Sequence, residues 1–131
     1  MEEYRFNNTV VYSCKYHVIW CQKSQRKVLE APIDARLREI VASVCAETEA
    51  EVIEMEVMPD HFHLLVGCDL QFGIHRLVKA IKGRSSRLLR DEFPDLKSRL
   101  PSLWTNNYFA CTVGEAPLAV IKQYIETQKG A

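Results

Sequence analysis

Two histidines separated by one apolar residue, His61 and His63, occupy the run MPDHFHLLVG. Side chains of a strand alternate between its two faces, so both imidazoles would project from one face while Phe62 and Leu64 point to the other. Imidazole binds divalent Mn, Fe, Ni and Zn, so the pair could begin a metal site that takes its remaining ligands from oxygens elsewhere. The alternative is a pair of solvated or hydrogen-bonded histidines on a strand surface.

A tyrosine and an amide share one edge of a helix near the end of the chain, in the segment EAPLAVIKQYIETQKG. Leu118, Ile121 and Ile125 form one apolar stripe, and Tyr124 lies on the flank of that stripe. Gln128 follows one helical turn later. The pattern by itself is also typical of a helical tyrosine that packs its ring and exposes its hydroxyl.

The charges of the chain are unevenly distributed although its formal net charge is zero. Residues 1–60 carry 7 Lys and Arg against 11 Asp and Glu, whereas residues 61–131 carry 10 against 6. One stretch without acids contains Arg76, Lys79, Lys82, Arg84, Arg87 and Arg90. Such a stretch attracts phosphates. The alternative, a solvated helix face, is weakened because counter-charges three or four residues away are absent until Asp91.

At 131 residues the chain is expected to form one domain, residues 1–131, with a core of its own. Its apolar runs are shorter than the roughly 20 residues of a membrane span, and its first residues lack the layout of a signal peptide, so we expect a cytoplasmic protein with no membrane partner. Five cysteines, never arranged as C-x-x-C, indicate neither a disulfide framework nor a zinc ribbon.

Hydrophobic periodicity predicts a regular order of elements. The order is a strand over 9–21, a helix over 33–50, a strand over 52–58, the histidine strand, a basic helix over 72–93, a strand over 108–113 and a helix over 117–129, with an irregular connection over 97–107. This β-α-β-β-α-β order predicts an α+β, ferredoxin-like antiparallel sheet with both crossover helices on one face, plus a C-terminal helix that carries Tyr124. The histidine strand would be interior, and the other face of the sheet would be free for a ligand.

The run MPDHFHLLV, followed some sixty residues later by YIETQ, resembles the single-tyrosine HUH transposases (transposase A type) of small bacterial insertion sequences. Close relatives of that family are the REP-associated tyrosine transposases. The resemblance covers nearly the whole chain, through YSCKYHVIWCQKSQRKVL, VIEMEVMPDHFHLLVG, RLVKAIKGRSSRLLR, WTNNYFACTVG and IKQYIETQ. It implies a transposase that nicks and rejoins single-stranded DNA at insertion-sequence ends by metal-assisted transesterification.

In that chemistry Tyr124 would attack the scissile phosphorus and leave a 5′-phosphotyrosine and a free 3′-OH. His61 and His63, with the Gln128 amide oxygen, would hold a divalent metal, Mg or Mn, and leave positions open for phosphate oxygens. Rejoining would need no ATP or other nucleotide cofactor, because the phosphotyrosine keeps the energy of the ester. A phenol has a pKa near 10, and the sequence identifies no dedicated base for it.

The resemblance also implies partners. Family members are homodimers with composite active sites, and they bind single-stranded DNA with hairpin ends. By that analogy the basic helix would grip the hairpin, and Val113 to Pro117 would be the hinge of the tyrosine helix.

Two other classes of function compete with this interpretation. A domesticated hairpin-binding relative would act on genomic repeats with or without cleavage, although a pure binder has no need of both histidines, Tyr124 and Gln128. A hydrolytic metalloenzyme for a small substrate would require more carboxylate or histidine ligands nearby. Among the other polar residues, Asp60 is expected to serve a Pro-Asp turn more than an imidazole, and His17 and His75 are expected to have structural or DNA-contact roles.

Overall fold

The computed structural model describes residues 5–6, 11–12, 14–23, 27–99, 102–112 and 118–128, of which 5–6, 11–12, 99 and 118–122 are described by their backbone alone. Its main sheet contains β3 (Lys15–Cys21), β4 (Glu51–Met58), β5 (His61–Gly67) and β6 (Phe109–Thr112). Its helices are α1 (Ile33–Glu47), α2 (Ile74–Glu92), α3 (Pro94–Arg99) and α4 (Leu118–Thr127). A separate two-stranded sheet pairs β1 (Arg5–Phe6) with β2 (Val11–Tyr12).

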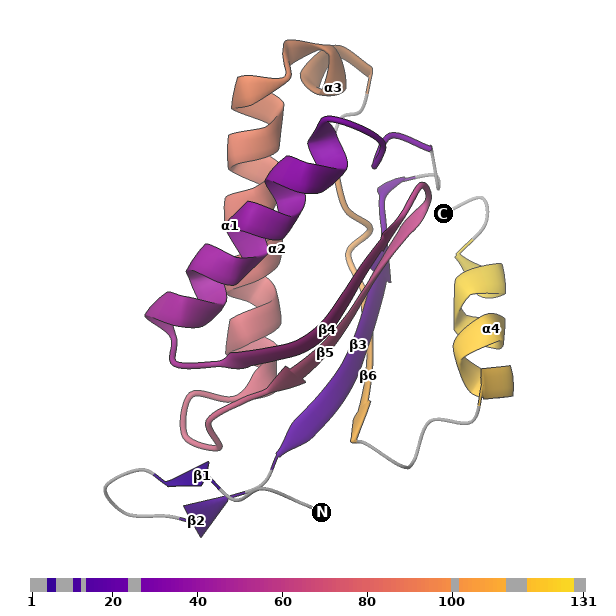
Figure 1. The fold of residues 1–131 in the computed structure, drawn as a ribbon. Helices are drawn as coiled ribbons and strands as arrows, with labels where there is room; N and C mark the ends of the chain where they lie inside the picture. The colour runs from indigo at the N-terminus through magenta and orange to yellow at the C-terminus, as the bar shows by residue number, and fades with distance from the viewer. Residues whose placement is uncertain are drawn as a thin grey trace.

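The strands of the main sheet follow the order β4-β5-β3-β6, and all neighbours are antiparallel. This is the predicted ferredoxin-like arrangement, with the histidine strand β5 in the interior. Figure 1 shows α1 and α2 side by side on one face of the sheet and α4 on the other face. The face predicted to be free for a ligand is therefore covered in part by the helix that carries Tyr124.

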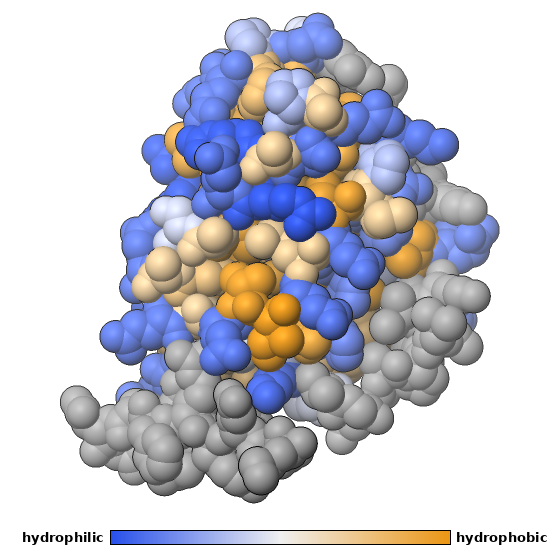
Figure 2. All heavy atoms as spheres, viewed as in Figure 1, coloured by the Kyte–Doolittle hydropathy of each residue, from blue (hydrophilic) through white to orange (hydrophobic). Residues whose placement is uncertain are grey.

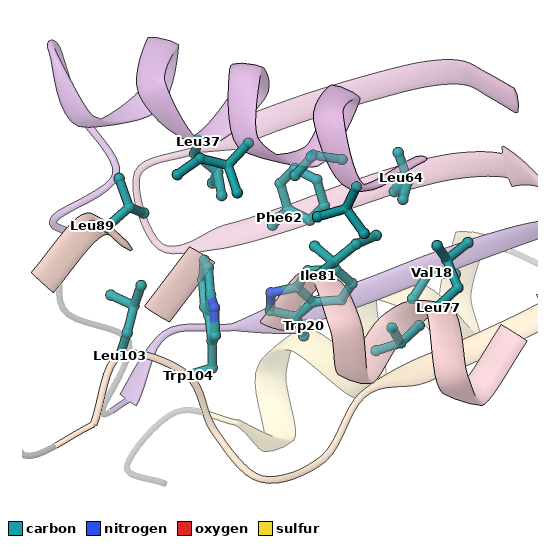
Figure 3. Packing of buried hydrophobic residues seen from close by; sticks show 14 of the residues in the cluster. Val18, Trp20, Leu37, Phe62, Leu64, Leu77, Ile81, Leu89, Leu103 and Trp104 are labelled. Atoms are coloured by element: carbon teal, nitrogen blue, oxygen red, sulfur yellow. The ribbon is translucent and has the colours of Figure 1, made fainter. Parts of the chain in front are cut away.

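The core lies between the sheet and helices α1 and α2. Alternate residues of β3 and β5, among them Trp20 and Phe62, point into this layer and are fully buried (Figure 3). The rings of these two residues lie 4.8 Å apart between centroids, and the Trp104 Nε1–H donates to the Ser85 hydroxyl at 2.9 Å, which satisfies a buried polar pair. On the face of the molecule seen in Figure 2, hydrophobic patches lie between hydrophilic side chains.

Several boundaries differ from those predicted. The strand expected over 9–21 is divided into β2 and β3, and α3 occupies the start of the connection expected to be irregular over 97–107. Helix α1 ends at Glu47 instead of Ala50, because Glu49 adopts a φ of 59° and the Ala50 N–H bonds back to the Cys45 carbonyl at 2.8 Å. That reversal satisfies the last carbonyls of the helix and stops it.

All five cysteines are free thiols, as predicted, and Cys21, Cys45 and Cys68 are buried. Within the described part of the chain, none of the helices combines the length and the apolar character needed to cross a membrane.

Candidate active site

The histidine pair projects from the face of the sheet opposite the core. His61 and His63 are half-buried on β5, whereas Phe62 and Leu64 between and beyond them are fully buried, so the alternation predicted from the sequence is confirmed. Strand β3 pairs Cys21 with His61 and Ile19 with His63. Because opposite residues of an antiparallel pair share a face, both imidazoles lie beside the outward side chains of β3.

His61 is oriented by the carboxylate that precedes it. Its Nδ1 lies 2.9 Å from Oδ1 of Asp60, which stands in the turn between β4 and β5. A carboxylate on Nδ1 fixes the tautomer of the ring and leaves Nε2 to accept a ligand. Asp60 therefore stands in the turn, which is the role that the sequence favoured. It also bonds to the imidazole, which is the role that the sequence made less expected.

His63 has a second imidazole as its partner. Its Nε2 lies 3.1 Å from Nδ1 of His17 on β3, and the two rings are 5.3 Å apart and nearly parallel, at 20°. On its other side, Nδ1 lies 4.0 Å from the Glu56 carboxylate of β4. Burial, and then the neighbouring His17, lower the pKa of His63. The neutral imidazole that results is the form that binds metals.

Sequence reasoning missed the pairing of His17 with His63. The signal that could have found it is the antiparallel register, since His17 stands an even number of residues from Ile19 and Cys21 and so shares their face.

Tyr124 lies over the same face of the sheet, on α4, which packs against β3. Its hydroxyl donates to Oδ1 of Asn107 at 3.1 Å, and its ring lies 5.7 Å from that of Phe109 on β6. Burial, and then the nearby thiol of Cys21, raise the pKa of Tyr124, so its phenol is neutral near pH 7. A nucleophilic role for this side chain would require a group that favours loss of its proton.

Gln128 stands in the turn after the end of α4, instead of within the helix as predicted, and it is only 7 % exposed. The two histidines and Gln128 offer two imidazoles and one amide oxygen. No group of three His, Cys, Asp or Glu residues suited to a metal occurs in the part of the chain that the structure describes. Two imidazoles and an amide oxygen suit a transition ion such as Mn²⁺ more closely than Mg²⁺, and either ion would take water or phosphate oxygens in its other positions.

The six cations of α2 have different surroundings. Lys79 and Arg87 are exposed, Arg90 is half-buried, and the Arg76 guanidinium lies 4.4 Å from the centre of the Phe72 ring. Arg84 forms a two-pronged ion pair with Glu47 of α1, including a 3.2 Å contact from Nη2 to Oε1. The sequence showed no counter-charge for this helix because the acid belongs to another helix.

The side chain of Lys82 extends from α2 toward the segment that precedes β6. Its half-buried ammonium donates to the carbonyls of Thr105 at 2.7 Å and Asn107 at 3.1 Å. Next to it, a cavity of about 320 Å³ opens between α2 and residues 102–108. At this cavity the His75 ring stacks on Tyr108, with Nδ1 and the hydroxyl 2.8 Å apart.

Known proteins resemble this chain over nearly its whole length. The family described as "Transposase IS200 like" matches residues 10–128. The ISDra2 transposase TnpA of Deinococcus radiodurans is 42% identical over 120 residues, which cover 90% of this chain and 86% of the relative. The transposase for insertion sequence element IS200 of Salmonella typhimurium is 28% identical over 119 residues, covering 89% of this chain and 78% of the relative.

Solved structures agree with these matches. A crystal structure of a Deinococcus radiodurans R1 protein described as a transposase has a TM-score of 0.88 and 37% identity, and the alignment covers 97% of this chain and 99% of the other. A REP-associated tyrosine transposase bound to a REP hairpin has a TM-score of 0.59 at 13% identity, covering 96% of this chain and 69% of the other, which shows a common fold.

We expect the imidazole of His63 to titrate below 6.5, the ordinary value, in metal-free protein. Because its pKa is lowered in the folded chain, the unfolded chain takes up the proton first, and stability decreases as the pH falls through 6.5. Proton–nitrogen NMR of the ring measures the pKa. In His17→Gln the pKa should return only part of the way, since burial is the larger cause. A His63 that titrates at or above 6.5 would contradict this account.

Proposed function

We propose a mechanism for a chain that belongs to the IS200-like transposase family and is therefore a DNA transposase. It nicks and rejoins single-stranded DNA at insertion-sequence ends through a 5′-phosphotyrosine on Tyr124. The observation that carries this proposal is the position of α4, which brings Tyr124 to the sheet face from which His61 and His63 project.

The cleavage step exchanges one phosphate ester for another. The Tyr124 phenol gives up its proton to solvent, and its oxygen attacks phosphorus while the bond from phosphorus to the 3′ oxygen breaks. The 3′ oxygen takes up a proton from solvent and leaves as a 3′-OH. In rejoining, a 3′-OH attacks the phosphotyrosine and returns the phenol, so the number of ester bonds is unchanged and no ATP is consumed. His61, His63 and the Gln128 amide would hold Mg²⁺ or Mn²⁺, which supplies polarisation of the phosphodiester when bound.

The proposed DNA partner is a single strand with hairpin ends, gripped by α2. Lys79 and Arg87 expose their charges to solvent, and Arg76 presents its guanidinium over an aromatic ring, so these three can meet phosphates without losing a contact within the protein. Arg84 and Lys82 already bind Glu47 and two backbone carbonyls. We therefore assign the larger share of phosphate binding to the first three.

We also propose that the protein acts as a homodimer with composite active sites, in which α4 of one subunit serves the histidines of the other. In this structure α4 packs against β3 of its own chain. The hinge expected over Val113 to Pro117 lies outside the described residues. A domesticated relative acting on genomic repeats remains the alternative, but 42% identity to an insertion-sequence transposase supports the mobile-element enzyme.

Tyr124→Phe should reduce the covalent protein–DNA adduct on a denaturing gel to background, because it removes the attacking oxygen. The fold should persist, since the lost hydrogen bond to Asn107 is worth about 1 kcal/mol. Tyr16→Phe and Tyr108→Phe are the matched controls and should keep the adduct. An adduct that survives in Tyr124→Phe and maps to another tyrosine would disprove the assignment.

His61→Ala and His63→Ala should each abolish nicking of labelled single-stranded DNA in Mg²⁺ or Mn²⁺ and weaken Mn²⁺ binding measured by electron paramagnetic resonance. Hairpin affinity should stay nearly constant, because α2 makes the grip. His75→Ala, which removes an exposed imidazole on α2, is the control for the metal measurement and should leave Mn²⁺ binding unchanged. Full nicking in the presence of a chelator would refute the metal requirement.

Lys79→Gln combined with Arg87→Gln should weaken hairpin binding and reduce the slope of log affinity against log salt by roughly 1.4–1.8, since each phosphate contact contributes about 0.7–0.9. Fluorescence anisotropy across a salt series measures this. Lys97→Gln, an exposed cation on α3, should change the slope little. If the double variant keeps the original slope, α2 is a solvated surface and the grip lies elsewhere.

A further inference from the structure

We propose that Asn107 is a positioning residue for the nucleophile: its side-chain amide holds the Tyr124 hydroxyl at the side of β3 opposite His61. This inference rests on the proposed role of Tyr124, and in a composite site the subunit that supplies His61 and His63 would also supply Asn107, because Asn107 directly precedes β6 of the same sheet. It concerns a residue whose amide reaches the reacting group through one hydrogen bond of 3.1 Å.

A bulge in the chain before β6 aims Asn107 at the tyrosine. Gln22 bridges Trp104 and Ile19 pairs with Phe109, so residues 105–108 stand opposite residues 20–21, four residues against two. Bulges of this kind redirect a side chain and are common beside active sites. In a regular ladder the residues before Phe109 would continue the pairing and their alternation.

Two anchors hold the bulge in place. Thr105 donates through its backbone N–H and its hydroxyl to the Cys21 carbonyl, at 3.0 and 3.1 Å. From the other side, the ammonium of Lys82 binds the carbonyls of Thr105 and Asn107. The backbone that carries the amide is therefore fixed both to β3 and to α2.

The resulting position suits attack on a phosphate. On one side of β3, Cys21 pairs with His61 of β5. On the other side, toward β6, the Thr105 N–H donates to the carbonyl of Cys21. Because neighbouring strands lie about 4.8 Å apart, β5 and the β6 side are separated by about 10 Å across β3. The Tyr124 ring packs on Phe109, which pairs with Ile19 two residues before Cys21, so the phenol lies near this level of the sheet. A phosphodiester can lie between the imidazoles and the hydroxyl, whereas direct contact between them would leave it no room.

The chemistry of the amide also favours this role. As an acceptor it binds the neutral phenol, and it cannot remove the proton, so it sets geometry without acting as a base. When the phenol loses its proton to another group, rotation of the amide presents its N–H to the oxygen, and such a bond favours the charged form. A carboxylate at the same place could accept from the phenol but would repel the phenolate.

The test compares Asn107→Ala and Asn107→Asp with Asn106→Ala, the neighbouring exposed amide. We measure the single-turnover rate of adduct formation at saturating DNA, the DNA affinity, and the pH dependence of the rate. Asn107→Ala should slow the adduct about 10- to 100-fold with affinity unchanged within twofold, since small misplacements of reacting groups cost this much. Asn107→Asp should also be slow and should shift the rate profile to higher pH. Asn106→Ala should match the unmodified protein.

A wild-type rate in Asn107→Ala would overturn the proposal, as would a pH profile of Asn107→Asp that superimposes on that of the unmodified protein. A loss of DNA affinity parallel to the loss of rate would also overturn it, because Asn107 would then be a DNA contact. Failure of the proposed function is distinguishable: in that case the unmodified protein forms no adduct, or Tyr124→Phe retains it.

Discussion

The pairing of β3 with a strand on each side fixes the direction of the side chains in the candidate site. His61 stands opposite Cys21, and both His63 and Phe109 stand opposite Ile19. Because side chains alternate with a period of two, a slip of one residue would turn the imidazoles into the core and expose Phe62. Fully burying an aromatic side chain is worth about 1.5–3 kcal/mol, so hydrophobic packing on one face determines where the polar groups of the other face lie.

The parts of the fold that depend on this alternation could be predicted from the sequence. The shared face of His61 and His63, the interior position of their strand and the topology of the sheet all follow from periodicity and element order. The end of α1 at Glu47 could not, because it depends on a backbone reversal at Glu49 that the apolar pattern does not encode. The aim of Asn107 could not either, since it results from a bulge produced by a mismatch in length between two distant segments.

One physical cause, the removal of water, affects the two kinds of reactive group in opposite ways. Burial disfavours the charged form of any group, so it lowers the pKa of His63 and raises that of Tyr124. The imidazole is thereby kept in the form that accepts a cation, whereas the phenol is kept in the form that does not attack. If Tyr124 is the nucleophile, as proposed, its phenol requires a base or a nearby positive charge to favour loss of its proton.

The positions of the cations around α2 carry information that a count of charges does not. At about 100° per residue, Arg76, Lys79, Arg87 and Arg90 fall within a sector of roughly 80° on the helix, while Lys82 and Arg84 fall on its two flanks. The structure follows this division: Arg84 meets Glu47 of α1, and Lys82 meets the carbonyls of the bulged segment. A run that the sequence presents as one phosphate-binding stripe therefore contains three exposed cations, Arg76, Lys79 and Arg87, and two flanking residues that bind the neighbours of the helix. Because the Lys82 ammonium binds the Asn107 carbonyl, a cation first assigned to DNA would also help to position Tyr124 under the proposal made for Asn107.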